Sequence, residues 1–436
     1  MERTLTKQIY QKAGCKVRLL GWVHVIRKQG KISFLLLRDI SGIVQTVTSK
    51  ENIEVFSVIQ KLSEESVIEI IGSVKEEKQA PGGYEVQIDE IKIISEAPGV
   101  FPIPIIEKGE ETEQQKRLDF RWLDLRKPEK RLIFQVWTTM EKTFRDFCIQ
   151  EDFIEIHSPK LTVTSTESGS ELFPVKYFDR TAYLVQSPQL YKQMAMAAGF
   201  EKVFEIGPVF RANPSFTSRH DTEFTMYDVE ISFIESHHDL LALEEQLIQV
   251  MVQEIKEKYG SEIQKFYKRE LIIPEIPFPR FSFREVKNIL LTKGVVGEKV
   301  DDLCPEEERA ICEYVQKEKG HEFVFIYDYP ASGRAFYSMR HETDPALSKT
   351  FDLLWNGLEI TSGAQREHRY EKLLEQIKEK GLKTEPFESY LNFFKYGCPP
   401  HGGFAPGPTR MLMKIFDINS VREVTYLYRG VNRLTP

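Results

Sequence analysis

The sequence predicts an α+β protein in two parts: a small five-stranded β-barrel, then a larger domain whose helices flank an antiparallel sheet. Three observations support this. Residues 16–95 contain five short β-branched runs separated by polar or glycine breaks. A stretch rich in proline and charge follows at 96–115. Beyond it, runs with helical apolar spacing occur in series with strand-like runs.

The five runs of the first part are "KVRLLGWVHVI", "KISFLLLRD", "GIVQTVT", "SVIEIIGSVKE" and "GYEVQIDEIKII". Five strands in about eighty residues suit a small closed barrel, and the oligonucleotide-binding (OB) barrel has that strand count. The pattern favours this barrel, and another small β-module stays open as the alternative.

The stretch "EAPGVFPIPIIEKGEETEQQ" marks the domain boundary. Proline stiffens such a segment into an extended spacer. We therefore expect the barrel domain at residues 1–100, a hinge or linker at 101–129, and the second domain at 130–436.

The second part combines helices and strands. "RLIFQVWTTMEKTFRDFCIQEDF" predicts one amphipathic helix, and "DLLALEEQLIQVMVQEIKEKYG" predicts another that stops at Gly260. Four strand-like runs accompany them: "KVFEIGPVFR", "FTMYDVEISF", "EFVFIYDYP" and "FDLLWNGLEI". Strands in series with helices at the sides indicate an antiparallel sheet.

Composition limits the class of protein. The net charge of −7 over 436 residues gives no global basic field, although a local basic groove is enough to bind phosphates. Five scattered cysteines without a Cys-x-x-Cys pair favour free thiols in a reducing compartment over disulfides or zinc. No apolar signal core and no run of membrane-spanning length occurs. We expect a cytoplasmic protein with no membrane partner.

The densest polar cluster is "VFRANPSFTSRHDTEFTMYDVE", in which two strand-like segments flank a loop. Arg211 ends the first strand, and Arg219 and His220 lie on the loop. Guanidinium forks match phosphate oxygens, so this spacing suits a polyphosphate clamp. Phe224 offers a flat face for a base. A charged surface hairpin without such a role is the alternative.

A second cluster spans "TSTESGSELFPVKYF" and "QSPQLYKQM". Glu167 lies in a Ser/Thr/Gly loop, whereas Gln189 and Lys192 lie three residues apart at a helix start. A carboxylate for an ammonium group, with an amide and a cation for carboxylates, would form a pocket for a zwitterion. The alternative is a capped helix with a solvated face.

Two further stretches complete the set. In "FDLLWNGLEITSGAQREHR", Asp352 and Glu359 offer hard oxygen ligands, and Mg²⁺ commonly takes one or two carboxylates plus substrate phosphates. Ser362 opens a tight turn there, and Arg366 follows. In "HGGFAPGPTRM", a loop of glycine and proline delivers Arg410 to the start of a helix. The four stretches together indicate a site for ATP and an amino acid.

The whole chain resembles aspartyl-tRNA synthetases of the compact archaeal type, which are class II aminoacyl-tRNA synthetases. Class II motif 1 corresponds to "EIHSPKL" with Pro159, motif 2 to "FRAN…TSRHDTEF", and motif 3 to "GGFAPGPTRM". "SPQLYKQ", "GLEITSGAQREHR", "YGCPPHGGF" and the terminal "RLTP" strengthen the match, which runs from residue 1 to 436.

The resemblance implies an OB-fold domain that binds the anticodon, a hinge, and a class II catalytic domain built on an antiparallel sheet. It implies a homodimer formed through motif 1. The implied reaction activates L-aspartate with ATP and Mg²⁺ to aspartyl-adenylate, and transfers the aspartyl group to the 3′ end of tRNA-Asp.

The resemblance also assigns roles around ATP. The positions matching Arg211 and the pair Arg219 and His220 hold the α-phosphate and the γ-phosphate end, respectively. Those matching Phe224 and Arg410 cover the two faces of adenine. The implied ATP contacts also include Asn213, Glu359 and Gly407, and the implied catalytic set is Arg211, Arg219, His220 and Glu359.

The resemblance also implies which positions bind aspartate and the metal ion. Those matching Glu167, Gln189, Lys192 and Arg366 bind aspartate, with Lys192 and Arg366 on its side-chain carboxylate. Glu359 and Ser362 match Mg²⁺ ligands, and Asp352 is a further metal candidate. The related asparaginyl enzymes usually carry an apolar residue where Lys192 stands, so this lysine favours aspartate, since an unpaired buried ammonium is costly.

In the barrel, Phe34, Gln45 and Glu85 match positions that contact the central anticodon bases, where stacking and edge hydrogen bonds read unstacked RNA. His24 and Pro81 occupy positions where discriminating archaeal-type enzymes tend to carry Trp and Lys. Members that also charge tRNA-Asn tend to carry this His/Pro pair. The resemblance therefore implies an enzyme that charges both tRNA-Asp and tRNA-Asn.

Three departures from the family lie around ATP. Asn213 replaces a usual Glu, the motif 3 core reads Ala-Pro-Gly-Pro-Thr-Arg, which removes two backbone donors, and "YLYRGVNRLTP" replaces a Phe-Pro-Arg-Asp pattern. These leave three alternatives. One is a paralogue with altered ATP handling that activates aspartate under stress from an adenylate-mimicking inhibitor. The second is a paralogue with a non-tRNA acceptor, and the third is a non-catalytic RNA-binding protein.

Overall fold

The computed structural model describes residues 1–106, 111–163, 171–215 and 217–436. The chain forms two compact units, Met1–Pro104 and Ile105–Pro436. The short helices α2 (Gln114–Asp119) and α3 (Arg121–Asp124) lie within the residues expected to link the domains, and they fall in the second unit. None of the helices in these described ranges has the length and apolar character needed to cross a membrane.

The first unit is a closed five-stranded barrel with the order β1-β2-β3-β5-β4, as the sequence predicts. The strands are β1 (Lys16–Gln29), β2 (Ile32–Asp39), β3 (Gly42–Ser49), β4 (Val67–Glu76) and β5 (Tyr84–Ser95). Helix α1 (Ile53–Lys61) joins β3 to β4, and two short 3₁₀ helices lie at Thr6–Lys12 and Pro81–Gly83.

Alternation of side chains along each strand closes the barrel around an apolar core. Val17, Leu19 and Val23 of β1 are buried, as are Leu35 and Leu37 of β2. The residues between them face outward, because successive side chains of a strand point to opposite faces. Only the parallel pairing of β3 with β5 breaks the antiparallel pattern.

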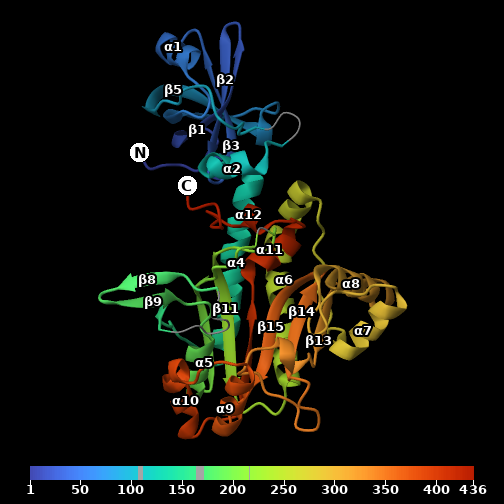
Figure 1. Cartoon of the computed structure of the whole chain (residues 1–436). Coiled ribbons are helices and arrows are strands. Elements are labelled where there is room, and N and C mark those ends of the chain that lie inside the picture. The colour runs from blue at the N-terminus through green and yellow to red at the C-terminus, as the bar shows by residue number, and fades with distance from the viewer. Residues whose placement is uncertain (107–110, 164–170, 216) are drawn as a thin grey trace. The chain divides into compact units, whose positions relative to one another are not determined.

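The second unit is built on an eight-stranded sheet with the order β12-β13-β14-β15-β16-β11-β10-β6 (Figure 1). Its strands are β6 (Ile154–Glu155), β10 (Lys202–Phe210), β11 (Glu223–Ser232), β12 (Arg280–Ser282), β13 (Phe323–Tyr327), β14 (Thr350–Trp355), β15 (Leu358–Arg366) and β16 (His401–Pro406). All pairs are antiparallel except β10 with β6 and β12 with β13. The expected antiparallel sheet is confirmed.

Helices cover this sheet. The long helices α4 (Pro128–Gln150) and α6 (His237–Tyr267) pack against each other, and α6 also packs on β15 and β16 (Figure 1). The other helices are α5 (Gln189–Ala197), α7 (Phe283–Thr292), α8 (Pro305–Lys319), α9 (Tyr370–Glu379), α10 (Glu388–Lys395), α11 (Pro408–Phe416) and α12 (Val421–Val424). Short 3₁₀ helices lie at Ala331–Gly333 and Glu385–Phe387. A small three-stranded sheet has the strand order β7 (Leu161–Thr162), β9 (Arg180–Leu184), β8 (Pro174–Tyr177).

The predicted stop of the second long helix at Gly260 is wrong. Helix α6 continues to Tyr267, and Lys268 ends it in the left-handed conformation with φ 59°. Ile263 is fully buried in the main core, and Tyr267 packs edge-on against Phe416. These apolar contacts outweigh the roughly 1 kcal/mol that a mid-helix glycine costs.

A buried ion network ties the C-terminal helix α12 to the start of the second unit. The carboxylate of Glu423 accepts hydrogen bonds from Arg117 at 2.6 and 2.8 Å, from Lys130 at 3.1 Å and from Gln114 at 2.8 Å. Burial opposes ionisation of Glu423, but the hydrogen bond from Arg117 and the charge of Lys130 hold its pKa well below the usual range. The network should therefore contribute to stability whenever Glu423 is ionised.

We expect Glu423→Gln to destabilise the second unit by about 3 kcal/mol near pH 7, because Arg117 and Lys130 lose their shared buried carboxylate and keep only their pairs with Glu111 and Asp124. Since the folded pKa of Glu423 lies below its unfolded value of about 4.3, this contribution is present above that pH and is lost as the pH falls further. Thermal unfolding of both proteins between neutral and acidic pH measures the difference. Asp146→Asn, which removes the exposed i,i+4 pair with Lys142 on α4, is the matched control and should have little effect.

Candidate functional site

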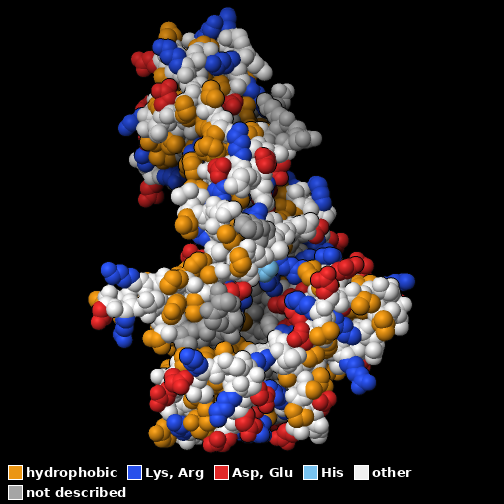
Figure 2. All heavy atoms as spheres, in the orientation of Figure 1, with side chains coloured by type: hydrophobic (Ala, Val, Ile, Leu, Met, Phe, Trp, Pro, Cys, Tyr) orange, Lys and Arg blue, Asp and Glu red, His pale blue; other side chains and the backbone are white. Residues whose placement is uncertain are grey.

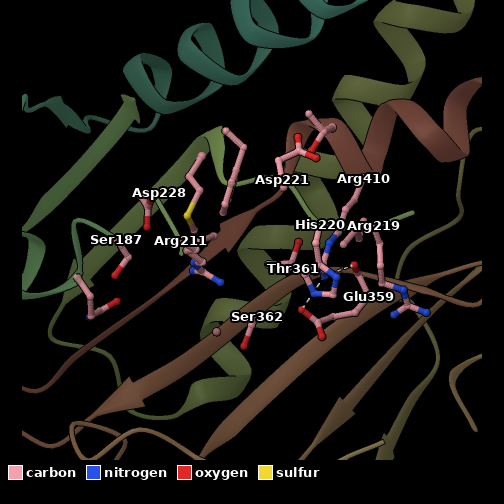
Figure 3. Close-up of a pocket in the computed structure, with 18 of the residues that line it drawn as sticks. Ser187, Arg211, Arg219, His220, Asp221, Asp228, Glu359, Thr361, Ser362 and Arg410 are labelled. Carbon is pink, nitrogen blue, oxygen red and sulfur yellow. Dashed lines mark hydrogen bonds and ion pairs between the residues drawn. The ribbon is translucent and has the colours of Figure 1, made fainter. Parts of the chain in front are cut away.

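A polar cavity lies over the strands at the centre of the eight-stranded sheet. Strands β11, β15 and β16, the segments that follow β10, and the starts of α5 and α11 supply its lining (Figure 3). Acidic and basic side chains lie beside each other around this hollow in the space-filling view (Figure 2). The centre of an antiparallel sheet is a rigid support, so side chains from distant parts of the chain meet there in fixed positions.

Most of the residues singled out in the second domain line this one cavity. They are Gln189, Arg211, Asn213, Arg219, His220, Phe224, Glu359, Ser362, Arg366, Gly407 and Arg410. Two others do not line it: Lys192 is fully buried behind it, and Asp352 is buried in β14. Glu167 lies outside the described residues.

One end of the cavity is cationic. Arg219, His220 and Arg410 lie together there, on the loop after β10 and on α11, and Arg211, which directly follows β10, lies nearer Ser187 and Asp228 (Figure 3). Burial and the charges of Arg410, Arg219 and Arg211 lower the pKa of His220, which keeps its ring neutral at pH 7. A cluster of three guanidinium groups in a partly enclosed site is suited to a polyphosphate.

Two of these arginines are paired with carboxylates of the protein. Arg219 donates to Glu308 of α8 at 2.9 Å, and Arg410 donates to the Glu359 carboxylate at 3.1 Å and to the Glu359 carbonyl at 2.9 Å. The third, Arg211, lies over the ring of Phe224, with its guanidinium carbon 5.4 Å from the ring centroid. The pairs hold the side chains extended across the cavity.

The other end of the cavity holds a buried charge cluster. The ammonium of Lys192 lies 3.0 Å from Asp228 and 3.3 Å from Glu230, and Arg366 donates to Glu230 at 3.0 Å. Burial opposes ionisation of Glu230, but Arg366 and Lys192 lower its pKa, whereas burial raises the pKa of Asp228 despite Lys192. Asp228 and Arg366 face the cavity, so the cluster presents one anion and one cation to it.

Gln189 lies at the same end, at the first position of α5. Its Nε2 is buried and makes no hydrogen bond within the described part of the chain. An amide donor held in this way is a ready partner for a carboxylate, since a buried donor without a partner is costly.

The glycines of "HGGF" make room for this cluster. A Cβ on Gly403 would lie 2.0 Å from the carbonyl oxygen of Val229 and 2.3 Å from Oε2 of Glu230. The Gly403 carbonyl also accepts a hydrogen bond from Arg366 at 3.1 Å. The neighbouring His401 is fully buried, and burial lowers its pKa to about 4, so its ring is neutral.

The two unusual prolines of this stretch lie where the backbone can accept them. Pro406 ends β16, and Pro408 is the first residue of α11, where the helix needs no N–H donor. Gly407 between them donates to the Ile360 carbonyl at 2.8 Å. The loop therefore delivers Arg410 to the cavity without the backbone donors that proline removes.

The other departures are also accommodated. The Asn213 side-chain oxygen accepts from the Ser215 N–H at 2.8 Å, which fixes the bend after β10. Tyr428 donates its hydroxyl to the His220 carbonyl at 3.2 Å, and Thr222 donates to the Arg429 carbonyl at 3.1 Å. The altered C-terminal segment thus supports the loop that carries Arg219 and His220.

The candidate metal ligands divide into two groups. Glu359 and Ser362 face the cavity from β15, and the Glu359 side chain keeps 35% of its surface exposed. Burial in the cavity, with the charges of Asp352 and Glu308 nearby, raises the pKa of Glu359 although Arg410 opposes this. Asp352 is instead bound by Arg334, at 2.7 and 3.3 Å.

Among the described residues, no group of three or more His, Cys, Asp or Glu side chains is placed to hold a metal ion. One carboxylate and one hydroxyl on the cavity floor still fit Mg²⁺, which commonly completes its shell with phosphates and water. The donor set thus suits a metal that arrives with a nucleotide.

In the barrel, the residues singled out for RNA lie close together on neighbouring strands. Gln45 donates to Glu85 at 2.9 Å across the β3–β5 pair, and Phe34 lies on β2 two residues before Leu36, the cross-strand partner of Gln45. Pro81 begins the turn before β5. His24 on β1 accepts a hydrogen bond from Arg38 of β2 at 3.0 Å.

Sequence reasoning missed several residues of the main cavity. Asp228, which lines the cavity, and Glu230, which is buried beside it, fall within the quoted polar stretch but are not singled out there, although "YDVEIS" places acids at alternate positions on β11. Glu308 and Arg334 do not line the cavity but pair with Arg219 and Asp352, and they come from segments far from any motif. Ser187, Asp221, Met226 and Tyr337 also line the cavity without a distinctive pattern.

The fold and the cavity define a class of protein that comparison with known families confirms. Residues 113–429 match the family of class II tRNA synthetases for D, K and N, and residues 17–94 match the OB-fold nucleic acid binding domain. The chain belongs to the class II tRNA synthetase family of this D, K and N group.

Relatives of similar length carry aspartate in their names. The chain is 43% identical to the Aspartate--tRNA(Asp) ligase of Pyrococcus abyssi, over 97% of each chain. It is 44% identical to the Aspartate--tRNA(Asp/Asn) ligase of Methanopyrus kandleri, over 98% of this chain and 97% of the relative.

Solved structures with the same fold include enzymes for both amino acids. The asparaginyl-tRNA synthetase of Pyrococcus horikoshii bound to asparaginyl-adenylate superposes with a TM-score of 0.93 at 36% identity, over the full length of both chains. The aspartyl tRNA synthetase of Entamoeba histolytica gives 0.90 at 31% identity, over 100% of this chain and 93% of that one. The fold alone does not select the amino acid.

We expect Gly403→Ala to disrupt the amino-acid end of the cavity, because the added methyl would overlap the Val229 carbonyl and the Glu230 carboxylate. The variant should unfold at a lower temperature and require much more aspartate for half-maximal pyrophosphate exchange. Gly407→Ala is the control for stability, since its Cβ would meet nothing closer than 3.5 Å and its φ is −89°. A Gly403→Ala protein as stable and as active as wild type would contradict this account.

Proposed function

We propose that the chain is an aspartate--tRNA ligase that charges both tRNA-Asp and tRNA-Asn. The observation that carries the proposal is a single cavity with an arginine-rich end and, at the other end, the buried Lys192–Asp228–Glu230–Arg366 cluster. The first end suits a triphosphate, and the second suits an amino acid whose side chain is a carboxylate. Relatives named for aspartate over nearly the full length support it.

Placement of the amino acid follows from the charges. Asp228 would accept the substrate ammonium, Gln189 would donate to its α-carboxylate, and Arg366 would bind its side-chain carboxylate. Lys192 would add a second positive charge behind Arg366 as the substrate carboxylate enters. An asparagine amide would bring no charge to these two cations, so the site should favour aspartate.

Activation is then a phosphoryl-type displacement. The α-carboxylate oxygen of aspartate attacks the α-phosphorus of ATP, and pyrophosphate leaves with the electron pair of the broken P–O bond. Arg211 would stabilise the α-phosphoryl oxygens, while Arg219 and His220 hold the leaving end and Phe224 and Arg410 enclose adenine. Positioning and charge neutralisation suffice for such a step. Mg²⁺ held by Glu359 and Ser362 would supply further neutralisation of the phosphates.

Transfer completes the reaction. A ribose hydroxyl at the 3′ end of tRNA attacks the carbonyl carbon of aspartyl-adenylate and AMP leaves, so no side chain need become covalently attached. This reaction belongs to the cytoplasm, where we expect the protein to act. The barrel residues His24, Phe34, Gln45, Pro81 and Glu85 would bind the anticodon.

The three alternatives left open by the sequence are not favoured. The prolines of motif 3 occupy positions that need no N–H donor, and Arg410 reaches the cavity, so altered ATP handling has no structural basis here. A non-catalytic RNA-binding protein would not need the cluster of arginines and acids in the second unit.

We also propose a homodimer formed through the segment that matches motif 1. Strand β6 lies at the edge of the eight-stranded sheet, and Ile154 on it is 48% exposed. Two further apolar side chains are exposed in neighbouring segments: Ile149 near the end of α4, and Phe200 just before β10. An exposed apolar sheet edge in a soluble enzyme is a typical site of association.

Pyrophosphate exchange tests the substrate. ATP–pyrophosphate exchange should depend on L-aspartate and respond weakly to L-asparagine, and Lys192→Met should reduce the aspartate-dependent rate by at least about a hundred-fold, because Asp228 and Glu230 lose a buried cation. Lys202→Met, at the start of β10 and away from the cavity, is the control and should retain exchange. A preference for asparagine would overturn the proposal.

Charging of purified tRNAs tests the acceptor in the same preparation. Both tRNA-Asp and tRNA-Asn should accept aspartate with comparable kcat/KM. Charging of tRNA-Asp alone would remove the dual specificity but leave the aspartate ligase assignment intact. Exchange without charging of either tRNA would favour a different acceptor.

Sedimentation tests the dimer. The protein should sediment with twice the chain mass of 50.8 kDa, and Ile154→Arg should shift it toward the monomer. Val300→Arg, at a position 86% exposed before α8, is the control and should leave the mass unchanged. A wild-type monomer at micromolar concentration would contradict this part of the proposal.

A further inference from the structure

Asp221 is a buried acid in the wall of the nucleotide end of the cavity. It follows His220 on the loop after β10, lines the cavity, and lies near Arg410 in the close-up view (Figure 3). Only 8% of its surface is exposed, and its Oδ1 has no hydrogen-bond partner within the described part of the chain. The proposed reaction gives this carboxyl group no role, although a buried oxygen without a donor is costly.

The neighbours of Asp221 hold its backbone in place. The His220 carbonyl accepts a hydrogen bond from the Tyr428 hydroxyl at 3.2 Å, and the Thr222 N–H donates to the Arg429 carbonyl at 3.1 Å. Tyr428 and Arg429 both belong to the C-terminal segment, so the loop is fastened to it on either side of Asp221. A donor for Oδ1 therefore has to come to the carboxyl group.

The contact between Asp221 and Thr425 indicates where the carboxyl group holds its proton. The Thr425 hydroxyl lies 3.3 Å from Oδ2 of Asp221 and donates to the Val421 carbonyl at 2.8 Å. A hydroxyl group has a single proton to donate, and a carbonyl can only accept, so the shorter bond takes this proton. The contact with Asp221 is then completed by a proton on Oδ2, which Thr425 accepts.

The charges around Asp221 agree with a carboxyl group that keeps its proton in the free enzyme. Burial raises the pKa of Asp221 to about 7, although Thr425 and the charges of Arg410 and Arg422 oppose this. Burial and nearby arginines lower the pKa of the adjoining His220, so its ring adds no charge at pH 7. Near this pH the carboxyl group is protonated in about half of the molecules, and a closer cation would remove the proton.

Arg410 is the cation that can come closer. Its Nη1 donates to the Glu359 carboxylate at 3.1 Å and to the Glu359 carbonyl at 2.9 Å, and its side chain is 25% exposed. A nucleotide that brings a metal ion to Glu359 would take this carboxylate from Arg410. The other cation, Arg422, lies over the ring of Tyr428, 5.3 Å from its centroid, in the segment that holds the loop.

We propose that Asp221 is the second partner of Arg410: when ATP binds, the guanidinium leaves Glu359, donates to Oδ1 of Asp221, and is held over the adenine base. The proton on Oδ2 passes to solvent, so the new pair carries one positive and one negative charge. Thr425 then donates its hydroxyl proton to the Asp221 carboxylate, and the Val421 carbonyl keeps its hydrogen bond from the Thr425 N–H at 3.0 Å. The inference rests on the proposed function, since ATP is the ligand, and it makes Asp221 a positioning residue for Arg410.

The first test counts the protons released when ATP and Mg²⁺ bind to the full-length protein without aspartate, so that no adenylate forms. Calorimetric titrations in phosphate and in Tris, which differ in their enthalpy of ionisation, give this number. At pH 7 wild type should release about half a proton more per site than Asp221→Asn, and the difference should vanish at pH 8.5, where Asp221 is already ionised. Equal release at pH 7 would overturn the inference. Failure of wild type to bind ATP would instead contradict the proposed function.

The second test identifies the partner of Asp221 by the same titrations. Arg410→Met, with ATP at concentrations that saturate a weakened site, should lose the additional proton release, because the cation that removes the proton from Asp221 is gone. Asp146→Asn, on the exposed face of α4, is the matched control and should release as many protons as wild type. Wild-type release from Arg410→Met would exclude Arg410 as the partner.

The third test measures the KM for ATP in aspartate-dependent pyrophosphate exchange. Below pH 7 binding must also remove a proton, so the wild-type KM for ATP should fall about ten-fold between pH 6 and pH 8. In Asp221→Asn this KM should stay close to the wild-type value at pH 6, and the KM for aspartate should be the same in both proteins. Parallel pH profiles of the KM for ATP would contradict the positioning role. If Asp221→Asn fails to fold, the proton release of wild type and of Arg410→Met decides the matter.

Discussion

Glu230 is fully buried beneath the cavity and binds Arg366 through both carboxylate oxygens, while Lys192 lies 3.3 Å away. A carboxylate without partners could not stay ionised there, and two cations without it could not stay buried. The carboxylate connects α5, β11 and β15, since these elements supply Lys192, Glu230 and Arg366. The neighbouring strand β16 must then carry glycine at 403, because a side chain there would occupy the space of Glu230.

The ion pairs at the arginine-rich end of the cavity differ from those of the buried cluster around Glu230. Arg219 pairs with Glu308, which is buried, and Arg410 pairs with Glu359, which is partly exposed. Arg219 would leave Glu308 and Arg410 would leave Glu359 when a nucleotide enters, and Glu359 would then face the metal that accompanies it. The amino-acid end is thus rigid and selective, whereas the nucleotide end is held together by contacts that the substrate replaces.

Local patterns in the sequence were sufficient for the barrel and for the central strands, because those features depend on alternation and turns. Part of the cavity lining followed from short motifs, and further residues, such as Asn213 and Gly407, came from the family resemblance. The end of α6 was not predictable, since packing of Ile263 and Tyr267 overrides Gly260. Asp352 stays a predicted metal candidate, and its ion-pair partner Arg334 could not be predicted, because it lies 18 positions away in a segment without a motif. Glu308 of α8 is 89 positions from Arg219, so no local signal could have joined them.

Lys192 shows why the fold does not determine which amino acid the site binds, whereas the charges of the site do. An asparaginyl-tRNA synthetase superposes on this chain with a TM-score of 0.93, so the two share their fold. Lys192 itself does not touch the cavity, and it is paired with Asp228 and Glu230 rather than waiting unpaired for a substrate. Its ammonium is therefore not an unpaired charge that only a substrate could neutralise. The selective quantity is the charge of the whole cluster, in which two cations balance two carboxylates. When the substrate ammonium pairs with Asp228, one of the two cations loses part of its negative counter-charge. The side-chain carboxylate of aspartate supplies that charge again, whereas the amide of asparagine would not.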